Sequence, residues 1–353
     1  MNTNQFPDGI WPVMLTPFTE DNQVDYPALK ELVEWYIKNG ADGLFAVCQS
    51  SEMFALSLEE RTGIAEYVKK CAAGRVPVVA SGHISDGLDE QIQELRMMAQ
   101  TGVDAVVLIT NRMAAADESD DVWIRNTSDI LSHLPADVKL GLYECPKPYK
   151  RLMTEQTMRW CISTGRFYFL KDTCCDSATI RQRLQNCEGT GLKLFNANTA
   201  TFLESLQMGA HGYCGVMANM HPRLYRYLLD SFWNAGREEP SSGDKATGEV
   251  VGEVIGKTTG RVTGKIGKED SDLCLSGKNN GSLTALSEFL TMASLIEDHC
   301  YPVNAKYYLE LEGLPITLQT RVRDKGELSE TFRSEIRMLR DLSGRVEAEL
   351  VKE

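Results

Sequence analysis

The sequence predicts a (β/α)8 TIM barrel followed by a C-terminal helical appendage. Three observations indicate this fold: eight short apolar runs, amphipathic segments of helical period between them, and glycines where those helices would end. Repeated strand–helix units force a parallel sheet, and eight such units suggest closure into a barrel. An open doubly wound sheet is the alternative, although no G-x-G-x-x-G motif follows the first run.

The predicted strands are nearly continuous apolar runs, as expected for strands buried on both faces. They are Gly9–Leu15, Gly43–Val47, Val76–Ser81, Ala105–Ile109, Leu140–Tyr143, Phe167–Lys171, Leu192–Asn196 and Gly212–Gly215. The clearest amphipathic segments between them are predicted as helices. They are Tyr26–Asn39, Leu58–Ala72 and Leu88–Thr101, followed by Gly40, Gly74 and Gly102 at the positions of helix C-caps.

The chain divides into three predicted parts. Residues 1–235 form the barrel, and residues 283–353 carry helices over 283–298, 304–312 and 328–349 that pack on it. Residues 236–282 are rich in Gly, Ser, Thr and Lys and are predicted as a flexible surface insertion, because dense glycine disfavours a helix. An ordered turn repeat is the alternative for this segment.

Composition excludes several classes of function. The 353 residues carry a net charge of −13 with scattered positive charges, so nucleic acid is not an expected partner. No run approaches the roughly 20 apolar residues of a membrane span. The ten cysteines show no C-x-x-C spacing and no secretory signal is visible, which indicates free thiols and a cytoplasmic location. The five histidines lack metal-ligand spacing, so no metal is expected.

Working residues of such barrels lie at the C-terminal ends of the strands. Lys171 ends the sixth run, where desolvation would favour a neutral amine that attacks a carbonyl and forms a Schiff base. The alternative is a structural ion pair with Asp172 or another carboxylate. Tyr143 ends the fifth run and could relay protons as acid and base, or serve only as an aromatic wedge.

The second run ends in the polar loop Cys48-Gln-Ser-Ser-Glu52. Its hydroxyl and backbone N–H groups could hold a carboxylate. It could equally be a polar loop before a helix that Ser57 caps, since Ser57-Leu-Glu-Glu60 is a capping-box pattern. His83 follows the third run and either faces the barrel mouth or has a helix-surface or hydrogen-bonded role.

These residues resemble the dihydrodipicolinate synthase / N-acetylneuraminate lyase family. The resemblance runs from Gly9 to about Asp324, excepting the Gly-rich insertion. The motifs that carry it are Trp11-Pro-Val-Met-Leu-Thr-Pro-Phe18, Val24-Asp25, Ser57-Leu-Glu-Glu-Arg61, Leu142-Tyr143 with Pro146, Leu170-Lys171-Asp172, Ala210-His-Gly212 through Asn219, and Asn304-Ala-Lys306 through Pro315.

The resemblance implies a class I aldolase or lyase that needs no metal or organic cofactor. Lys171 would form an imine with pyruvate or a related 2-keto acid, and Tyr143 would relay protons. Ser50 and Ser51 would bind the keto-acid carboxylate, and the backbone around Cys214 would close the pocket near the imine. Members of the family are commonly homo-oligomers, so a dimer or tetramer is expected.

The sequence departs from the family pattern at the substrate loops. Gln49 stands where a relay hydroxyl is usual and cannot exchange a proton as a hydroxyl does. Pro148 replaces the arginine that grips the second substrate, and Lys147 or Lys150 could substitute as a point charge. The segment from Thr110 to Met113 lacks the tyrosine that reaches across the dimer, and Arg112 could contact an acidic substrate instead.

Three functions are compatible with these departures. The first is a pyruvate-type aldolase or lyase of unassigned specificity. The second is a dehydratase that acts on a sugar-derived keto acid through the same imine. The third is a barrel that binds a keto acid or sugar acid without turnover, which the replacement of a relay hydroxyl by Gln49 keeps open.

Overall fold

The computed structural model describes residues 6–235 and 279–350, and its centre is a single sheet of eight parallel strands. The strand order is β1-β8-β7-β6-β5-β4-β3-β2. The strands are β1 (Gly9–Ile10), β2 (Leu44–Phe45), β3 (Val78–Ala80), β4 (Ala105–Ile109), β5 (Leu140–Tyr143), β6 (Phe167–Asp172), β7 (Lys193–Asn196) and β8 (Gly212–Tyr213). All eight fall where the apolar runs predict them.

The sheet closes into a barrel between the segment after β1 and strand β2. Val13 and Phe45 form a parallel bridge, and the Met14 N–H donates to the Phe45 carbonyl at 3.0 Å. The β1 ladder is shorter than the predicted Gly9–Leu15, because Pro12 has no N–H to donate to a neighbouring strand. The prediction of a (β/α)8 barrel is confirmed, and the open doubly wound sheet is excluded.

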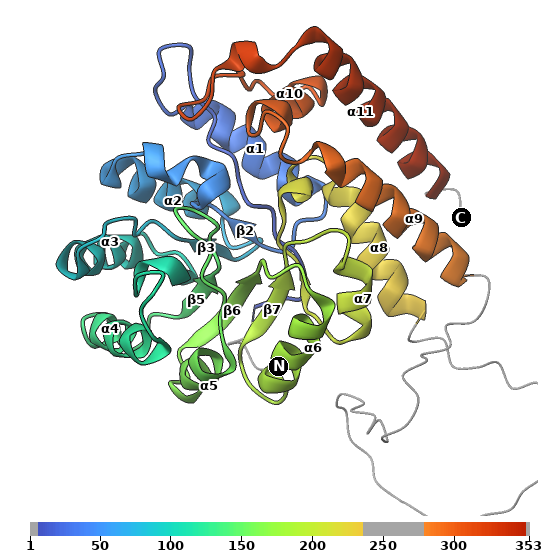
Figure 1. Cartoon of the computed structure of the whole chain (residues 1–353). Helices are drawn as coiled ribbons and strands as arrows, with labels where there is room; N and C mark the ends of the chain where they lie inside the picture. Colours follow the sequence, from blue (N-terminus) through green and yellow to red (C-terminus); the bar gives the residue numbers. More distant parts are fainter. Residues whose placement is uncertain (1–5, 236–278, 351–353) are drawn as a thin grey trace, which may run out of the picture.

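Helices surround the barrel, as Figure 1 shows. The first eight are α1 (Tyr26–Lys38), α2 (Leu58–Ala72), α3 (Leu88–Gln100), α4 (Asp120–Ser132), α5 (Glu155–Ser163), α6 (Ser177–Cys187), α7 (Phe202–Gln207) and α8 (Pro222–Ala235). Helix α2 begins with the predicted capping box between Ser57 and Glu60. Helices α1, α2 and α3 are followed by Gly40, Gly74 and Gly102, all at positive φ.

The C-terminal appendage consists of α9 (Asn279–Ala293), the 3₁₀ turn η5 (Ser294–Ile296), α10 (Val303–Leu311) and α11 (Glu330–Leu350). Helix α9 lies against α8, and α10 lies against α11 (Figure 1). Since α9 begins at Asn279, the predicted end of the insertion at 282 is wrong by one helical turn. The rest of that insertion lies outside the described residues. In the part that is described, no helix is long and apolar enough to span a membrane.

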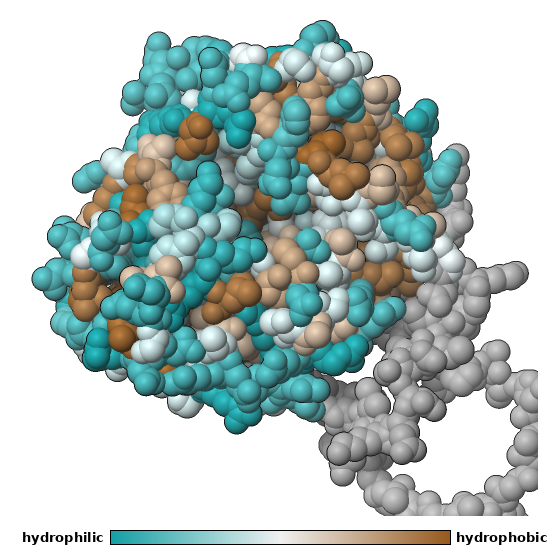
Figure 2. Space-filling model, in the orientation of Figure 1, coloured by the Kyte–Doolittle hydropathy of each residue, from teal (hydrophilic) through white to brown (hydrophobic). Residues whose placement is uncertain are grey.

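Large apolar side chains are exposed on this appendage. Met292 is 64 % exposed, Leu295 is 72 % exposed and Met338, on α11, is 61 % exposed. Figure 2 shows apolar residues on the surface of the C-terminal helices, at the upper right of the view, whereas the opposite edge is mainly polar. This face is therefore a candidate for contact with another chain.

Aromatic side chains fill the barrel interior beneath the C-terminal ends of the strands. The Phe169 ring stacks on Phe195 at 4.7 Å and lies 5.1 Å from Trp11, centroid to centroid. Because side chains alternate along a strand, Lys171 points to the same side of β6 as Phe169 and lies one layer nearer the mouth. The packed aromatic layer thus forms the floor below Lys171.

Candidate functional site

Lys171 and Tyr143 come together at the mouth of the barrel, on neighbouring strands. The two residues are paired in register between β5 and β6, and both are buried. The Lys171 Nζ lies 4.3 Å from the centre of the Tyr143 ring and 6.0 Å from the centre of the Phe45 ring. The predicted juxtaposition of the amine and the phenol is therefore present, with the amine against aromatic faces.

Lys171 does not form the structural ion pair that was the alternative reading. Asp172 points to the other side of β6 and pairs with Arg183 of α6, which also pairs with Glu144 at 2.6 Å. Within residues 6–235 and 279–350, Lys171 forms no ion pair with any carboxylate. The sequence did not reveal the buried group formed by Glu144, Asp172 and Arg183. Of these three residues, only Asp172 was named, as the alternative ion-pair partner of the adjacent Lys171.

Burial raises the pKa of the Tyr143 hydroxyl well above its ordinary value, and the nearby thiols of Cys145 and Cys48 raise it further. Burial likewise raises the pKa of the Cys214 thiol to about 12, although Lys171 lowers it. The phenol and the thiol are thus protonated at neutral pH. The Cys214 N–H is donated to the Asn196 carbonyl at 2.8 Å, so this backbone group is engaged within the sheet.

The loop after β2 brings Gln49, Ser50 and Ser51 to the mouth in a single 3₁₀ turn, η1 (Gln49–Ser51). The Gln49 Oε1 accepts from the Cys145 thiol at 3.3 Å, which places Gln49 beside the β5 end. The Ser51 hydroxyl lies 2.6 Å from the Met14 carbonyl and accepts from the Cys48 N–H at 3.1 Å. The Ser51 hydroxyl is thus engaged with the main chain, whereas the Ser50 hydroxyl is hydrogen-bonded with Tyr301 of the appendage.

A buried ion pair holds this loop to the appendage. The Lys306 Nζ of α10 donates to Glu52 Oε1 at 3.1 Å and to the Gln319 carbonyl at 2.6 Å. Glu52 also accepts from the Arg321 N–H at 2.6 Å and has a left-handed backbone with φ 61°. The C-terminal segment thus fixes the end of the loop that follows β2, which the sequence resemblance did not reveal.

A pocket of about 470 Å³ opens beside this loop. It is lined by Gln49, Glu52, Phe54, Arg112, Lys147, Pro148, Tyr301, Pro302 and Val322. Arg112 pairs with Asp86 at 2.6 Å, and its Nε is buried with no partner among the described residues. The pocket therefore presents two cationic side chains, Arg112 and Lys147, at the position where the sequence suggested contacts to an acidic substrate.

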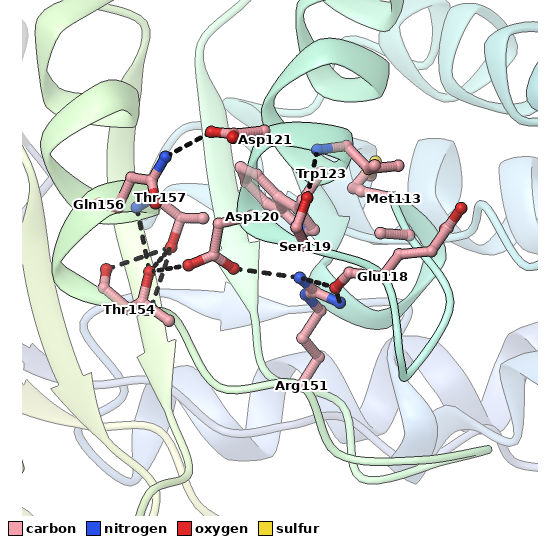
Figure 3. A network of polar contacts seen from close by, with 12 residues as sticks. Met113, Glu118, Ser119, Asp120, Asp121, Trp123, Arg151, Thr154, Gln156 and Thr157 are labelled. Carbon is pink, nitrogen blue, oxygen red and sulfur yellow. Dashed lines mark hydrogen bonds and ion pairs between the residues drawn. The ribbon is translucent and has the colours of Figure 1, made fainter.

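Hydrogen bonds fix the loops that carry these cations. The Asn111 Nδ2 lies 2.8 Å from the Cys145 carbonyl and 2.9 Å from that of Lys147. Farther along the same loop, Arg151 pairs with Asp120 at 3.1 Å, and the Thr154 hydroxyl donates to Asp120 at 2.6 Å (Figure 3). The loops after β4 and β5 are thus joined into one rim.

His83 is not a residue of the mouth. It is fully buried, its Nε2 accepts from the Ile109 N–H at 2.5 Å, and its Nδ1 lies 3.2 Å from Gln91 Oε1. Burial lowers its pKa to about 3, so the ring is neutral. The hydrogen-bonded alternative is therefore the correct one. No cluster of side chains suited to a metal ion occurs in the described part of the chain.

Comparison with known proteins defines the class of this barrel. The profile of the Dihydrodipicolinate synthetase family matches residues 6–246. The 4-hydroxy-tetrahydrodipicolinate synthase of Ruegeria pomeroyi is 32% identical over 222 residues, which cover 61% of this chain and 72% of the relative. That of Jannaschia sp. is 29% identical over 220 residues, covering 61% and 72%.

Solved structures of the same family share the fold. The dihydrodipicolinate synthase of Acinetobacter baumannii, complexed with pyruvate, aligns with a TM-score of 0.73 and 19% identity, covering 96% of this chain and 99% of that one. YagE of Escherichia coli K12, also in complex with pyruvate, aligns with a TM-score of 0.70 and 20% identity, covering 96% and 98%.

The fold and the matched profile define an enzyme of the lyase and aldolase class. The chain belongs to the dihydrodipicolinate synthetase family. This membership favours catalysis over the non-catalytic binding barrel that the departure at Gln49 had kept open.

Proposed function

We propose that the protein is a class I aldolase or lyase in which Lys171 forms a Schiff base with pyruvate or a related 2-keto acid. The observation that carries the proposal is a buried lysine with no ion pair among the described residues, held against the Tyr143 ring at the barrel mouth. An amine excluded from water and free of a carboxylate partner is suited to attack a carbonyl. The relatives solved with pyruvate support the choice of keto acid.

The surrounding residues have roles that follow from their positions. Tyr143 donates and accepts protons as the carbinolamine loses water, since its phenol is protonated and beside the amine. Ser50, with the N–H groups of its turn, binds the keto-acid carboxylate, and Ser51 supports that turn from below. Gln49 and Cys214 line the space around the imine, and Arg112 faces the second substrate.

Reversible C–C bond formation is the reaction this arrangement supports, because a protonated imine withdraws electrons from the neighbouring carbon. The second substrate enters from the pocket that holds Arg112 and Lys147, so an anionic molecule is favoured. We propose a homo-oligomer, supported by the exposed Met292, Leu295 and Met338. A cytoplasmic location is supported by the nine free cysteines of the described residues.

Reductive trapping tests the proposal. The protein is incubated with pyruvate and borohydride, and the intact mass is measured for the wild type, Lys171→Arg and Lys70→Ala. We expect one pyruvyl group per chain in the wild type and in the Lys70→Ala control, whose lysine is exposed on α2, and none in Lys171→Arg. Failure of the wild type to gain mass with any of a panel of 2-keto acids would refute the imine.

A further inference from the structure

Two buried carboxylates directly follow the two residues proposed to carry the chemistry. Glu144 comes after Tyr143 at the end of β5, and Asp172 comes after Lys171 at the end of β6. Because side chains alternate along a strand, the two carboxylates point away from the barrel interior, and both meet a residue of helix α6. Each carboxylate is therefore one peptide bond away from a residue that faces the mouth.

Arg183 of α6 joins the two carboxylates. Its Nη2 lies 2.6 Å from Glu144 Oε1 and its Nη1 lies 3.1 Å from Glu144 Oε2, so the guanidinium meets this carboxylate at two points. The same Nη1 also contacts Asp172 Oδ2. All three side chains are at most 3 % exposed. Arg183, Glu144 and Asp172 thus form a buried clamp, the Arg183 clamp, in which one planar cation bridges the ends of neighbouring strands.

The main chain beyond both strand ends is bound to the same carboxylates. Glu144 Oε1 accepts from the Met153 N–H at 2.7 Å, and Glu144 Oε2 accepts from the Thr173 N–H at 2.9 Å. The Thr173 hydroxyl donates to the Glu144 carbonyl at 2.8 Å. Asp172 Oδ1 accepts from the Cys174 N–H at 2.9 Å. The chain that leaves β5 and the chain that leaves β6 are therefore held by one connected group.

A second buried ion pair in the barrel offers a matched comparison. Arg61 of α2 pairs with Glu94 of α3 at 2.8 Å, and the two side chains are 4 % and 6 % exposed. Glu94 also accepts from the N–H groups of Ile84 and Ser85, at 2.8 and 3.2 Å. This pair resembles the Arg183 clamp in its burial and in its contacts to a loop. It lies on helices α2 and α3, however, and not at the ends of β5 and β6.

Imine formation depends on proton transfers close to the Lys171 amine. The Nζ lone pair bonds to the carbonyl carbon, and one N–H proton moves to the carbonyl oxygen. A second proton, from the Tyr143 phenol, lets that oxygen leave as water and gives the protonated C=N bond, after which the phenol recovers a proton from solvent. A misplacement of about 1 Å can lower the rate of such a step on the order of 10²-fold. The spacing of the amine and the phenol must therefore be held by the fold.

We propose that Arg183, Glu144 and Asp172 are positioning residues that set the spacing of the Lys171 amine and the Tyr143 phenol, an inference that rests on the proposed function. The Arg183 clamp makes no bond to the substrate. It holds the ends of β5 and β6 together, so that these two register partners keep one geometry. Loss of the bridge should therefore slow imine formation without weakening the binding of the keto acid.

Lysine substitution separates the charge of the clamp from its geometry. Arg183→Lys retains a buried cation but cannot bridge the carboxylates with two nitrogens. Borohydride quenching at successive times gives the rate constant of imine formation at saturating pyruvate and the pyruvate concentration for half-saturation, for the wild type, Arg183→Lys and Arg61→Lys. We expect Arg183→Lys to lower the rate constant on the order of 10²-fold with half-saturation within about twofold of the wild type. Arg61→Lys should match the wild type in both quantities.

Urea unfolding of the same variants measures the purely structural effect. Both substitutions disturb a buried ion pair, so both should lower the free energy of unfolding. A lower rate constant in folded Arg183→Lys alone would support the positioning role. A wild-type rate constant in Arg183→Lys, or an equal loss of rate in Arg61→Lys, would overturn it.

Glu144→Gln keeps the test decisive if Arg183→Lys does not fold. Glutamine has nearly the size of glutamate and loses only the charged contact with Arg183, so the rate constant should again fall. Combination with Tyr143→Phe gives a readout that a structural role would not change. Because the clamp acts by orienting the phenol, the double variant should be little slower than Tyr143→Phe alone, whereas independent losses would multiply. Multiplied losses would contradict the proposal.

The wild type distinguishes this inference from the proposed function. If the wild-type chain gains no mass with pyruvate and borohydride, the imine itself is refuted. If the wild type is trapped and Arg183→Lys forms the imine at the same rate, only the positioning role of the Arg183 clamp fails.

Discussion

The Lys171 Nζ lies 4.3 Å from the centre of the Tyr143 ring, and the two residues are register partners on β6 and β5. The amine is thus held over an aromatic face in a buried site. The phenol that faces it lies on a strand, whose backbone is held by hydrogen bonds on both sides. This rigidity is what a proton transfer over a fixed distance requires.

Tyr143→Phe should keep the ring and remove the hydroxyl. If the hydroxyl transfers protons during carbinolamine dehydration, the rate of imine trapping with pyruvate should fall on the order of 10²–10⁴-fold, whereas the final extent of trapping stays near one per chain. This rate is measured by stopping the reductive trapping reaction at successive times and determining the fraction of chains that carry the added mass. A time course like that of the wild type would show that Tyr143 only packs against the lysine.

Ser50→Ala and Ser51→Ala should separate ligand binding from support of the loop. Ser50→Ala should raise the pyruvate concentration for half-maximal trapping by about tenfold, the loss of one hydrogen bond to a charged group. Ser51→Ala should instead lower the free energy of unfolding by about 1–3 kcal/mol, because the Cys48 N–H and the Met14 carbonyl lose their buried partner. Urea unfolding and trapping titrations are measured on both variants. A loss of stability in Ser50→Ala together with weaker pyruvate binding in Ser51→Ala would show that these roles are misassigned.

Arg112→Ala should weaken binding of anionic substrates selectively. The Arg112 side chain is only 10 % exposed and lines the pocket beside Lys147. Trapping with 2-oxoglutarate, a keto acid with a second carboxylate, should need about tenfold more ligand for half saturation, and trapping with pyruvate should change little. Equal effects on the two acids would indicate that Arg112 does not contact the second carboxylate.

Arg183→Met should destabilise the barrel. It leaves Glu144 and Asp172 buried without their cation, and loss of one partner from a buried ion pair costs about 3–5 kcal/mol. Denaturant unfolding measures this change, with Arg75→Met as the control, since Arg75 pairs with Glu34 at an exposed site and should have no resolvable effect. Similar stabilities of the two variants would contradict the structural role of the buried group.

Much of the fold was predictable because the pattern of apolar and polar residues along the chain indicates which segments are buried. Each of the eight apolar runs contains a strand, and Lys171 and Tyr143 were found from the rule that strand ends meet at one mouth. The sequence did not reveal which polar groups are satisfied by main chain, so the hydroxyl of Ser51 could not be distinguished from that of Ser50.

The buried ion pair between Lys306 and Glu52 could not be predicted from the sequence. The two residues lie 254 positions apart along the chain, so no local pattern of apolar and polar residues indicates their contact.

Peptide mapping after reduction tests the central claim most directly. The described residues include two deeply buried lysines, Lys171 at the mouth and Lys306 beneath the loop that follows β2. After treatment with pyruvate and borohydride, tandem mass spectrometry should locate the added mass on Lys171, with Lys306 unmodified. A label on Lys306 or spread over exposed lysines, or no label at all, would contradict the account.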